Sequence, residues 1–324
     1  MGGILLHAGG IQETNKLKNN QPQMKPDPRF RSSTKKKPIK IMKQHTAELL
    51  LVIAVMIWGS SYIGLKEAEG GFAPFTIITL RFGIAFLFAA LIFHRSLTGI
   101  TRSALAAGAV LGFLLFCLIA FLLYALPTTP TTTAGFLVAT MVVLVPLIQA
   151  IFFRKIPGLP LIIGIILAVS GVALLTPGRE ALVFGYGTVL CLAGAACLAL
   201  QIIMTDIFLK TEEPLPVGIL QFGFAALFGL ISAVIVDPVP DLASGIAINA
   251  VLYLAIVCTM IAFILQTVAQ KYTTPEHTSL IFTLESVFAA LFGFVVLHEV
   301  LTIQGYAGVI LILSGVLIAV LKGF

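Results

Sequence analysis

The sequence predicts an all-α polytopic membrane protein, in which ten transmembrane helices form two inverted five-helix repeats. Of its 324 residues, 59% are apolar and only 10% are charged, whereas an ordinary soluble domain has about 25% charged residues. The apolar residues form runs of about the length needed to cross ~30 Å of hydrocarbon. The second half of the chain also repeats short motifs of the first half in the same order.

This composition excludes a soluble enzyme and a disordered chain. Mean hydropathy is +1.07, and no single water-soluble core could bury so much apolar surface. The cysteines lie inside apolar runs and show neither a disulfide framework nor metal-ligand spacing. We therefore expect no metal and no cofactor. The cysteines are Cys117, Cys191, Cys197 and Cys258.

Residues 1–45 form a basic tail that holds ten of the twenty Lys and Arg but only two acidic residues, Glu13 and Asp27. The tail is rich in Asn, Gln, Pro and Lys and has no apolar periodicity, so we expect it to be disordered and cytoplasmic. It lacks the features of a signal peptide. Because it directly precedes an apolar run, we interpret it as an orientation signal that can touch anionic lipid, rather than as a nucleic-acid binder.

After this tail, apolar runs follow one another with short breaks. The breaks carry Gly, Pro and Asp residues typical of turns, and Thr129-Pro130 and Thr274-Pro275 match a helix N-cap followed by Pro at the first helical position. We place the spans near 46–65, 72–93, 104–126, 131–153, 158–176, 185–208, 215–236, 246–269, 276–297 and 303–321.

The charges in the breaks predict the orientation. With the N-terminus inside, seven Lys and Arg beyond the tail lie on the inner side and two, Lys66 and Arg179, lie on the outer side. The positive-inside rule then places both termini in the cytoplasm of a multi-pass protein of the plasma membrane. The seven are Arg95, Arg102, Arg154, Lys155, Lys210, Lys271 and Lys322.

The internal repeat relates residues 46–176 to residues 185–321. Leu80-Arg81-Phe82-Gly83 returns in the second half as Leu220-Gln221-Phe222-Gly223, and Thr128-Thr129-Pro130 returns as Thr273-Thr274-Pro275. Since each repeat has an odd number of spans, the second enters the membrane from the opposite side. Inverted repeats of this kind are typical of transporters, with the substrate site near the midplane at the repeat interface.

Several of these segments resemble the EamA family of the drug/metabolite transporter superfamily. The similar segments are Trp58-Gly59-Ser60-Ser61, Pro74 with Leu80-Arg81-Phe82, Thr283 to Ala290, His298-Glu299, and Gly308 to Val316. The resemblance covers residues 46–321. It implies ten helices, cytoplasmic termini, a central cavity, and export or uptake of small metabolites, often amino acids or amphipathic compounds. The chain departs from the family pattern at Ser286, where Pro is common, and at Arg154-Lys155, where an acidic residue is common.

Polar residues inside the spans are the candidates for a substrate site, because a polar side chain facing lipid is costly. Trp58, Ser61 and Tyr62 share one face of the first span. The internal repeat relates Ser61 to Gln201 and Tyr124 to Gln266. Either these side chains line a cavity at the repeat interface, or they hold helices together by hydrogen bonds. For Trp58 the alternatives to the cavity are packing between helices and anchoring at the membrane interface. Gly108 and Gly112 form a GxxxG motif for close packing or dimerisation, so we expect a monomer or a homodimer.

Glu285 and Arg81 are the ionisable residues predicted to lie deepest in the membrane. Glu285 would carry a proton, bind a substrate ammonium, or form a structural pair, and Arg81 would be structural or bind a substrate carboxylate. Asp206 and Lys210 are spaced as a local ion pair. His94, His277 and His298 lie at span ends, where we expect solvated or interfacial roles.

These observations favour a secondary transporter, most consistent with an exporter, of a small organic metabolite such as an amino acid or an amphipathic compound. The alternatives are an integral-membrane enzyme and a channel or sensor. No nucleophile–base constellation supports the enzyme, and the internal two-fold symmetry argues against a channel. The chain has no Walker-type motif for ATP-driven transport.

Overall fold

The structure is a computed structural model that describes residues 42–129, 131–175, 185–238, 245–297 and 302–322. Within these ranges it leaves out the side chains of Tyr62, Lys66, Thr131, Thr132, Leu175, Leu297 and Lys322. Residues 1–41 of the basic tail lie outside the described residues, and so do Pro130 and His298.

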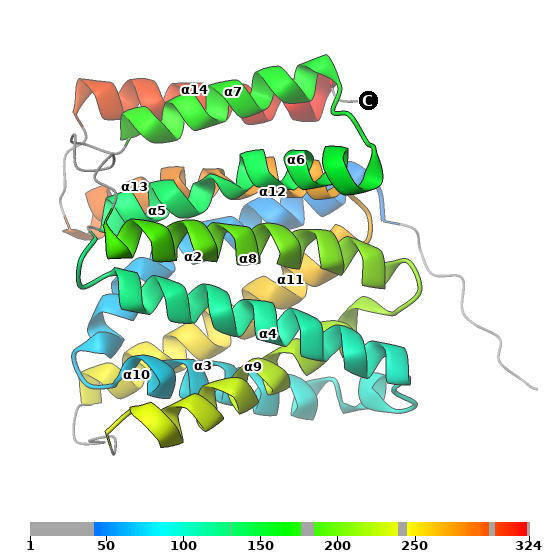
Figure 1. Cartoon of the computed structure of the whole chain (residues 1–324), viewed down its shortest axis with the longest axis vertical. Coiled ribbons are helices and arrows are strands. Elements are labelled where there is room, and N and C mark those ends of the chain that lie inside the picture. The colour runs from blue at the N-terminus through cyan, green and yellow to red at the C-terminus, as the bar shows by residue number, and fades with distance from the viewer. Residues whose placement is uncertain (1–41, 130, 176–184, 239–244, 298–301, 323–324) are drawn as a thin grey trace, which may run out of the picture. The chain divides into compact units, whose positions relative to one another are not determined.

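The described chain is built from helices that run back and forth along one axis (Figure 1). In chain order they are α2 (Gln44–Glu69), α3 (Pro74–Ile92), η2 (His94–Leu97), α4 (Arg102–Ala125), α5 (Thr131–Ala139), α6 (Met141–Phe153), α7 (Leu159–Leu175), α8 (Tyr186–Leu209), α9 (Pro214–Val236), α10 (Gly245–Tyr253), η4 (Leu254–Ile261), α11 (Ala262–Gln270), α12 (Pro275–Phe282), α13 (Leu284–Leu297) and α14 (Ile303–Lys322).

These helices confirm the predicted membrane fold. Within the described residues, nine helical stretches are long and apolar enough to cross a membrane, and a shorter apolar helix, α7, supplies the tenth span. Pro74 and Pro214 open α3 and α9, where a missing backbone N–H costs nothing. Thr274 caps α12 as predicted, because its side chain accepts a hydrogen bond from the backbone N–H of His277.

Three of the predicted spans are not continuous α-helices. The fourth span is divided into α5 and α6 at Thr140, and the ninth into α12 and α13 at Thr283. The eighth contains a π-helical segment, η4, between α10 and α11. Such interruptions are often found at functional sites.

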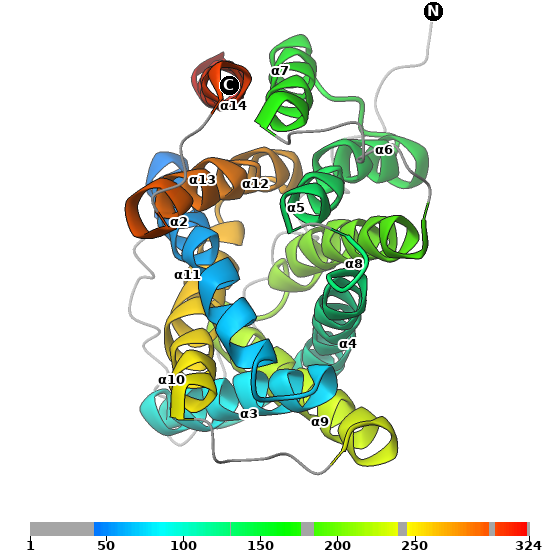
Figure 2. The same ribbon diagram turned by 90° about the vertical axis from the view of Figure 1, so that its left-hand side faces the viewer.

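The helix pairs follow an internal two-fold symmetry. In two pairs, α3 with α9 and α7 with α14, a helix packs on its own counterpart from the other repeat. In addition, α2 packs on α12 and α13, and its counterpart α8 packs on α5 and α6. In α7 and α14 the repeat glycines meet crosswise, because a Cβ on Gly164 would lie 2.8 Å from the Gly315 oxygen and Gly171 approaches Gly308. The α7–α14 pair lies at one edge of the helix assembly (Figure 2). The two repeats are therefore inverted copies.

The two ends of the helix assembly differ in charge. We call one end the basic end, because basic residues lie there in the connections or beside them, namely Arg95, Arg102, Lys155, Lys210 and Lys271. The chain enters α2 and leaves α8 at the basic end, on the right in Figure 1. The opposite end carries the first residues of α3 and α8.

Candidate functional site

A charged centre is formed by residues from the middle parts of three spans, in α3, η4 and α13. Arg81 of α3 is only 4% exposed. Its Nε donates a hydrogen bond of 2.6 Å to Thr259 Oγ1 of η4, and its guanidinium lies 5.7 Å from the ring centre of Phe82. Glu285, in the first turn of α13, lies within electrostatic range of Arg81. The two ionisable residues that the sequence placed deepest in the membrane are thus close enough to interact electrostatically.

Two helix irregularities adjoin this centre. Thr259 belongs to the π-helical segment, and Glu285 follows directly after the break at Thr283. At that break the Thr283 hydroxyl donates to the Leu280 carbonyl at 2.6 Å. The break at Thr140 shows the same type of hydrogen bond, because the Thr140 hydroxyl donates to the Leu137 carbonyl at 2.6 Å. Thr140 and Thr283 each divide the fourth span of their own repeat, so both repeats contain such a break.

Trp58 anchors α2 to the π-helical segment. Its indole Nε1 donates a hydrogen bond of 2.9 Å to the Cys258 carbonyl, and its ring packs on Phe263 and Phe282 with centroids 4.7 and 5.1 Å away. At Gly59 the backbone of α2 lies so close to Phe288 of α13 that a Cβ would be 2.6 Å from the Phe288 Cβ. The Trp-Gly pair therefore fixes α2 against the two irregular helices, next to the charged centre.

Gln201 and Gln266 meet in a buried polar network between α8, α9 and α11. Gln266 Nε2 donates to Gln201 Oε1 at 3.1 Å and to Gln270 Oε1 at 3.1 Å. Gln221 joins the network through its side-chain contacts with Gln201, at 3.5 Å, and with Thr267, at 3.3 Å. Gln266 Oε1 and Gln270 Nε2 are buried without a hydrogen-bond partner among the described residues. The network both joins helices and retains unused hydrogen-bonding capacity.

The other candidate residues lie apart from this network. Tyr124 lines an aromatic pocket of about 320 Å³ toward the opposite end, between α3, α4 and α8. Its ring centroid is 5.4 Å from that of Phe75, which stacks on Phe116. Ser61 is partly buried on α2. The Tyr62 side chain lies outside the described residues.

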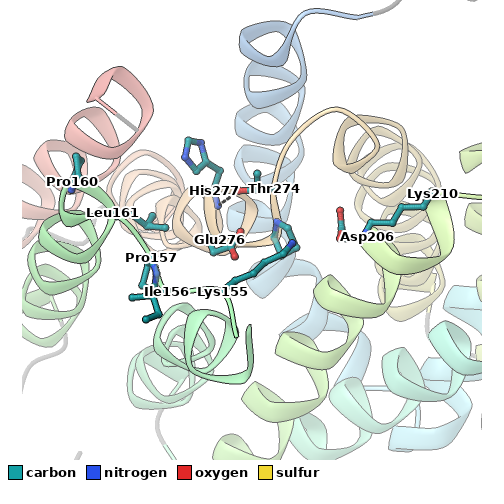
Figure 3. Close-up of a pocket in the computed structure, with 12 residues that line it drawn as sticks. Lys155, Ile156, Pro157, Pro160, Leu161, Asp206, Lys210, Thr274, Glu276 and His277 are labelled. Atoms are coloured by element: carbon teal, nitrogen blue, oxygen red, sulfur yellow. Dashed lines mark hydrogen bonds and ion pairs between the residues drawn. The ribbon is translucent and has the colours of Figure 1, made fainter. Parts of the chain in front are cut away.

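A larger pocket of about 690 Å³ lies at the basic end (Figure 3). Residues of α7, α8, α12 and the α6–α7 connection line it and carry both signs of charge. Asp206 and Lys210 form the predicted local pair, at 3.2 Å. The charged and imidazole residues of its lining are Lys155, Asp206, Lys210, Glu276 and His277.

At this pocket the structure corrects the expectation for His277. A solvated or interfacial side chain was expected, but His277 is only 6% exposed and its Nδ1 lies 2.9 Å from Glu48 Oε1 of α2. Glu48 is itself 4% exposed. His94, in contrast, is exposed.

The sequence interpretation missed Glu48 and Gln221. Glu48 stands close to the start of the first span, where an acid usually reaches water, so nothing in its local sequence indicated burial. Gln221 did carry a signal, because it is the repeat counterpart of Arg81. The predicted close packing at Gly108 and Gly112 is confirmed, since a Cβ on Gly112 would lie 2.6 Å from the Gln221 carbonyl of α9.

Comparison with known proteins gives the same fold and adds a family. A curated protein named "Uncharacterized transporter" from Archaeoglobus fulgidus is 31% identical over 281 residues, which cover 87% of this chain and 88% of that protein. A solved crystal structure matches with a TM-score of 0.73 at 18% identity and covers 86% of this chain and 97% of the other. The model of the EamA-like transporter family matches residues 45–176 and 185–321. The chain is a multi-pass membrane transporter and belongs to the EamA-like transporter family.

Proposed function

We propose that the protein is a secondary transporter that exports a small organic metabolite by alternating access, and that an amino acid is the best-supported class. The observation that carries this proposal is the charged centre of Arg81 and Glu285. Buried charges in a membrane protein need partners. A zwitterionic amino acid presents a carboxylate for Arg81 and an ammonium for Glu285, so it can take the place of each residue's partner. The aromatic pocket around Tyr124 supports amphipathic compounds as the second class.

The helix irregularities support alternating access. Thr140 divides the fourth span of the first repeat and Thr283 divides the fourth span of the second, so both repeats contain a helix that can bend near its middle. Inverted repeats with divided helices at a midplane site are a recurrent transporter design, in which one half-bundle rocks against the other. Bending at one of the two breaks would open the substrate site toward one side of the membrane. Bending at the other break would open it toward the opposite side.

The charge distribution supports the direction of transport. The positive-inside rule assigns the basic end to the cytoplasm, and with it both termini of a plasma-membrane protein. The pocket of about 690 Å³ at that end carries both signs of charge. A zwitterionic metabolite can therefore be loaded from the cytoplasm, as export requires.

Metabolite profiling tests this proposal. Cells that overexpress the chain should enrich a small set of amino acids in the medium, measured by mass spectrometry. Arg81→Gln and Glu285→Gln should abolish the enrichment at equal protein abundance, whereas Glu67→Gln, at an exposed carboxylate of α2, should retain it. Enrichment by both centre variants at the level of the parent would refute the charged centre as the site.

Purified Glu285→Gln in proteoliposomes then separates the roles of the carboxylate. Gln keeps the shape and hydrogen bonding of Glu but does not titrate. A proton-carrying role predicts that gradient-driven accumulation is lost while downhill exchange remains, and an ammonium-binding role predicts that both are lost. Unchanged transport at every pH would leave Glu285 with a structural role only.

A further inference from the structure

A second ionisable pair lies away from the charged centre. Among the charged and imidazole side chains of the described residues, Glu48, Arg81 and His277 are buried. Arg81 belongs to the centre. Glu48 and His277 meet at the basic end and join α2 to α12, with Glu48 Oε1 and His277 Nδ1 2.9 Å apart. A carboxylate–imidazole contact therefore joins two helices that belong to different repeats and lie far apart in the sequence.

The surroundings of the pair leave part of the carboxylate unsatisfied. Gln44 Nε2 donates to Glu48 Oε1 at 2.9 Å. Glu48 Oε2 is buried without a hydrogen-bond partner among the described residues, and His45 Nδ1, on a side chain 68% exposed, is 3.7 Å from it. His277 lies on the wall of the basic-end pocket (Figure 3). His277 is therefore both part of the pocket lining and the partner of a buried carboxylate.

The pair breaks the symmetry of the two repeats. The internal repeat relates Glu48 to Thr188 and His277 to Thr132. Threonine hydroxyls do not titrate near neutral pH. Of these two pairs of positions, the one at the basic end alone carries side chains that bind a proton.

We propose that Glu48 and His277 form a proton-binding site that controls the contact between α2 and α12. A carboxylate with an imidazolium is neutral as a pair, and this is the form that tolerates burial. Loss of the imidazolium proton removes the positive charge beside the buried Glu48 carboxylate, so the contact should loosen when that proton leaves.

Other charged groups face this region from the neighbouring elements. His45 lies on α2, Glu276 on α12, Lys155 on the α6–α7 connection, and Asp206 and Lys210 on α8. Asp206 and Lys210 balance each other at 3.2 Å. Replacing these groups should shift the transition, whereas replacing Glu48 or His277 should remove it.

The protein contains its own reporter for this contact. Trp58 is the single tryptophan of the chain, and it lies on α2 with its ring 5.1 Å from that of Phe282 on α12. Purified full-length protein in detergent should show a change in tryptophan emission between pH 5 and 9. Glu48→Gln and His277→Gln should each reduce that change at least about fivefold, because neither variant retains the titrating pair. His45→Gln and Glu285→Gln should retain it.

Each outcome of this titration is decisive. Circular dichroism and a single elution peak establish that a variant is folded, and either variant of the pair suffices for the test. A flat titration of the parent, or an unchanged transition in a folded Glu48→Gln or His277→Gln protein, would overturn the proposal. A transition lost in both of these variants and kept in the two controls would support it.

The consequence for transport rests on the proposed function and has a separate readout. In proteoliposomes, exchange of the amino acids found by profiling should depend on pH for the parent, and His277→Gln should lose the part of this dependence that Glu285→Gln retains. If the parent transports none of them, the proposed function fails while the tryptophan titration still decides the proton site.

Discussion

Trp58→Phe tests whether α2 holds the π-helical segment in place. The substitution removes the indole N–H, whose hydrogen bond to the Cys258 carbonyl is 2.9 Å long, and keeps an aromatic ring between Phe263 and Phe282. Leaving a buried acceptor without its donor costs about 1–3 kcal/mol in soluble proteins. Side-chain hydrogen bonds in membrane bundles average about 0.6 kcal/mol and reach about 1.7 kcal/mol. We therefore expect a loss of about 1 kcal/mol.

The effect on transport should exceed the effect on stability. Cys258 directly precedes Thr259, whose hydroxyl accepts the 2.6 Å hydrogen bond from Arg81. A shift of the π-helical segment therefore displaces a partner of the charged centre. Trp58→Ala, which also removes the ring contacts, should cost about 3–5 kcal/mol.

The assay is thermal unfolding in detergent. Circular dichroism and size exclusion are the probes, since the variant has no tryptophan. A loss of about 1 kcal/mol should lower the midpoint by roughly 2–4 °C. Ser61→Ala, one turn further along α2 and partly buried, is the matched control and should change stability by less than about 0.5 kcal/mol. Equal midpoints for Trp58→Phe and the parent, or an equal loss for Ser61→Ala, would refute this role of the indole.

Three further predictions concern packing, capping and orientation. Gly171→Leu should destabilise the α7–α14 pair by about 1–3 kcal/mol in the same thermal assay, because the α14 backbone leaves no room for a Cβ, whereas Gly185→Ala, in open space, should be neutral. Asp237→Ala should cost about 0.5–2 kcal/mol, because the carboxylate accepts hydrogen bonds of 2.6 and 2.9 Å at the start of α3; unchanged stability would contradict this cap. A reporter active only outside the cytoplasm should be silent after Phe324 and active within 177–184, and the reverse pattern would contradict the orientation.

The sequence predicted the helices well because their cause is local. A span needs about twenty apolar residues, and the chain marks its ends with Pro, Gly and Thr. Thus α3 and α9 begin at Pro74 and Pro214, close to the predicted starts. The breaks at Thr140 and Thr283 were not predicted, because a threonine inside an apolar run is also compatible with a continuous helix.

The residues of the candidate site could be predicted only where an ionisable side chain falls in the middle of an apolar span. Arg81 and Glu285 stand out in apolar runs, and the structure places them within electrostatic range of each other. Glu48 and His277 each stand near a span end and look ordinary in isolation. Their burial depends on the contact between α2 and α12, which lie in different repeats and far apart along the chain. Only tertiary structure reveals such a pair.

The two repeats share helix breaks and close glycine contacts but differ in their ionisable residues. Thr140 and Thr283 interrupt equivalent helices, and the glycines of α7 and α14 meet crosswise. The ionisable residues have no such counterparts, because Arg81 corresponds to Gln221 and Glu48 to Thr188. Under the proposed alternating-access function, a symmetric backbone would favour opening at neither end. The substrate preference and the direction of transport would then depend on the side chains that break the symmetry rather than on the fold.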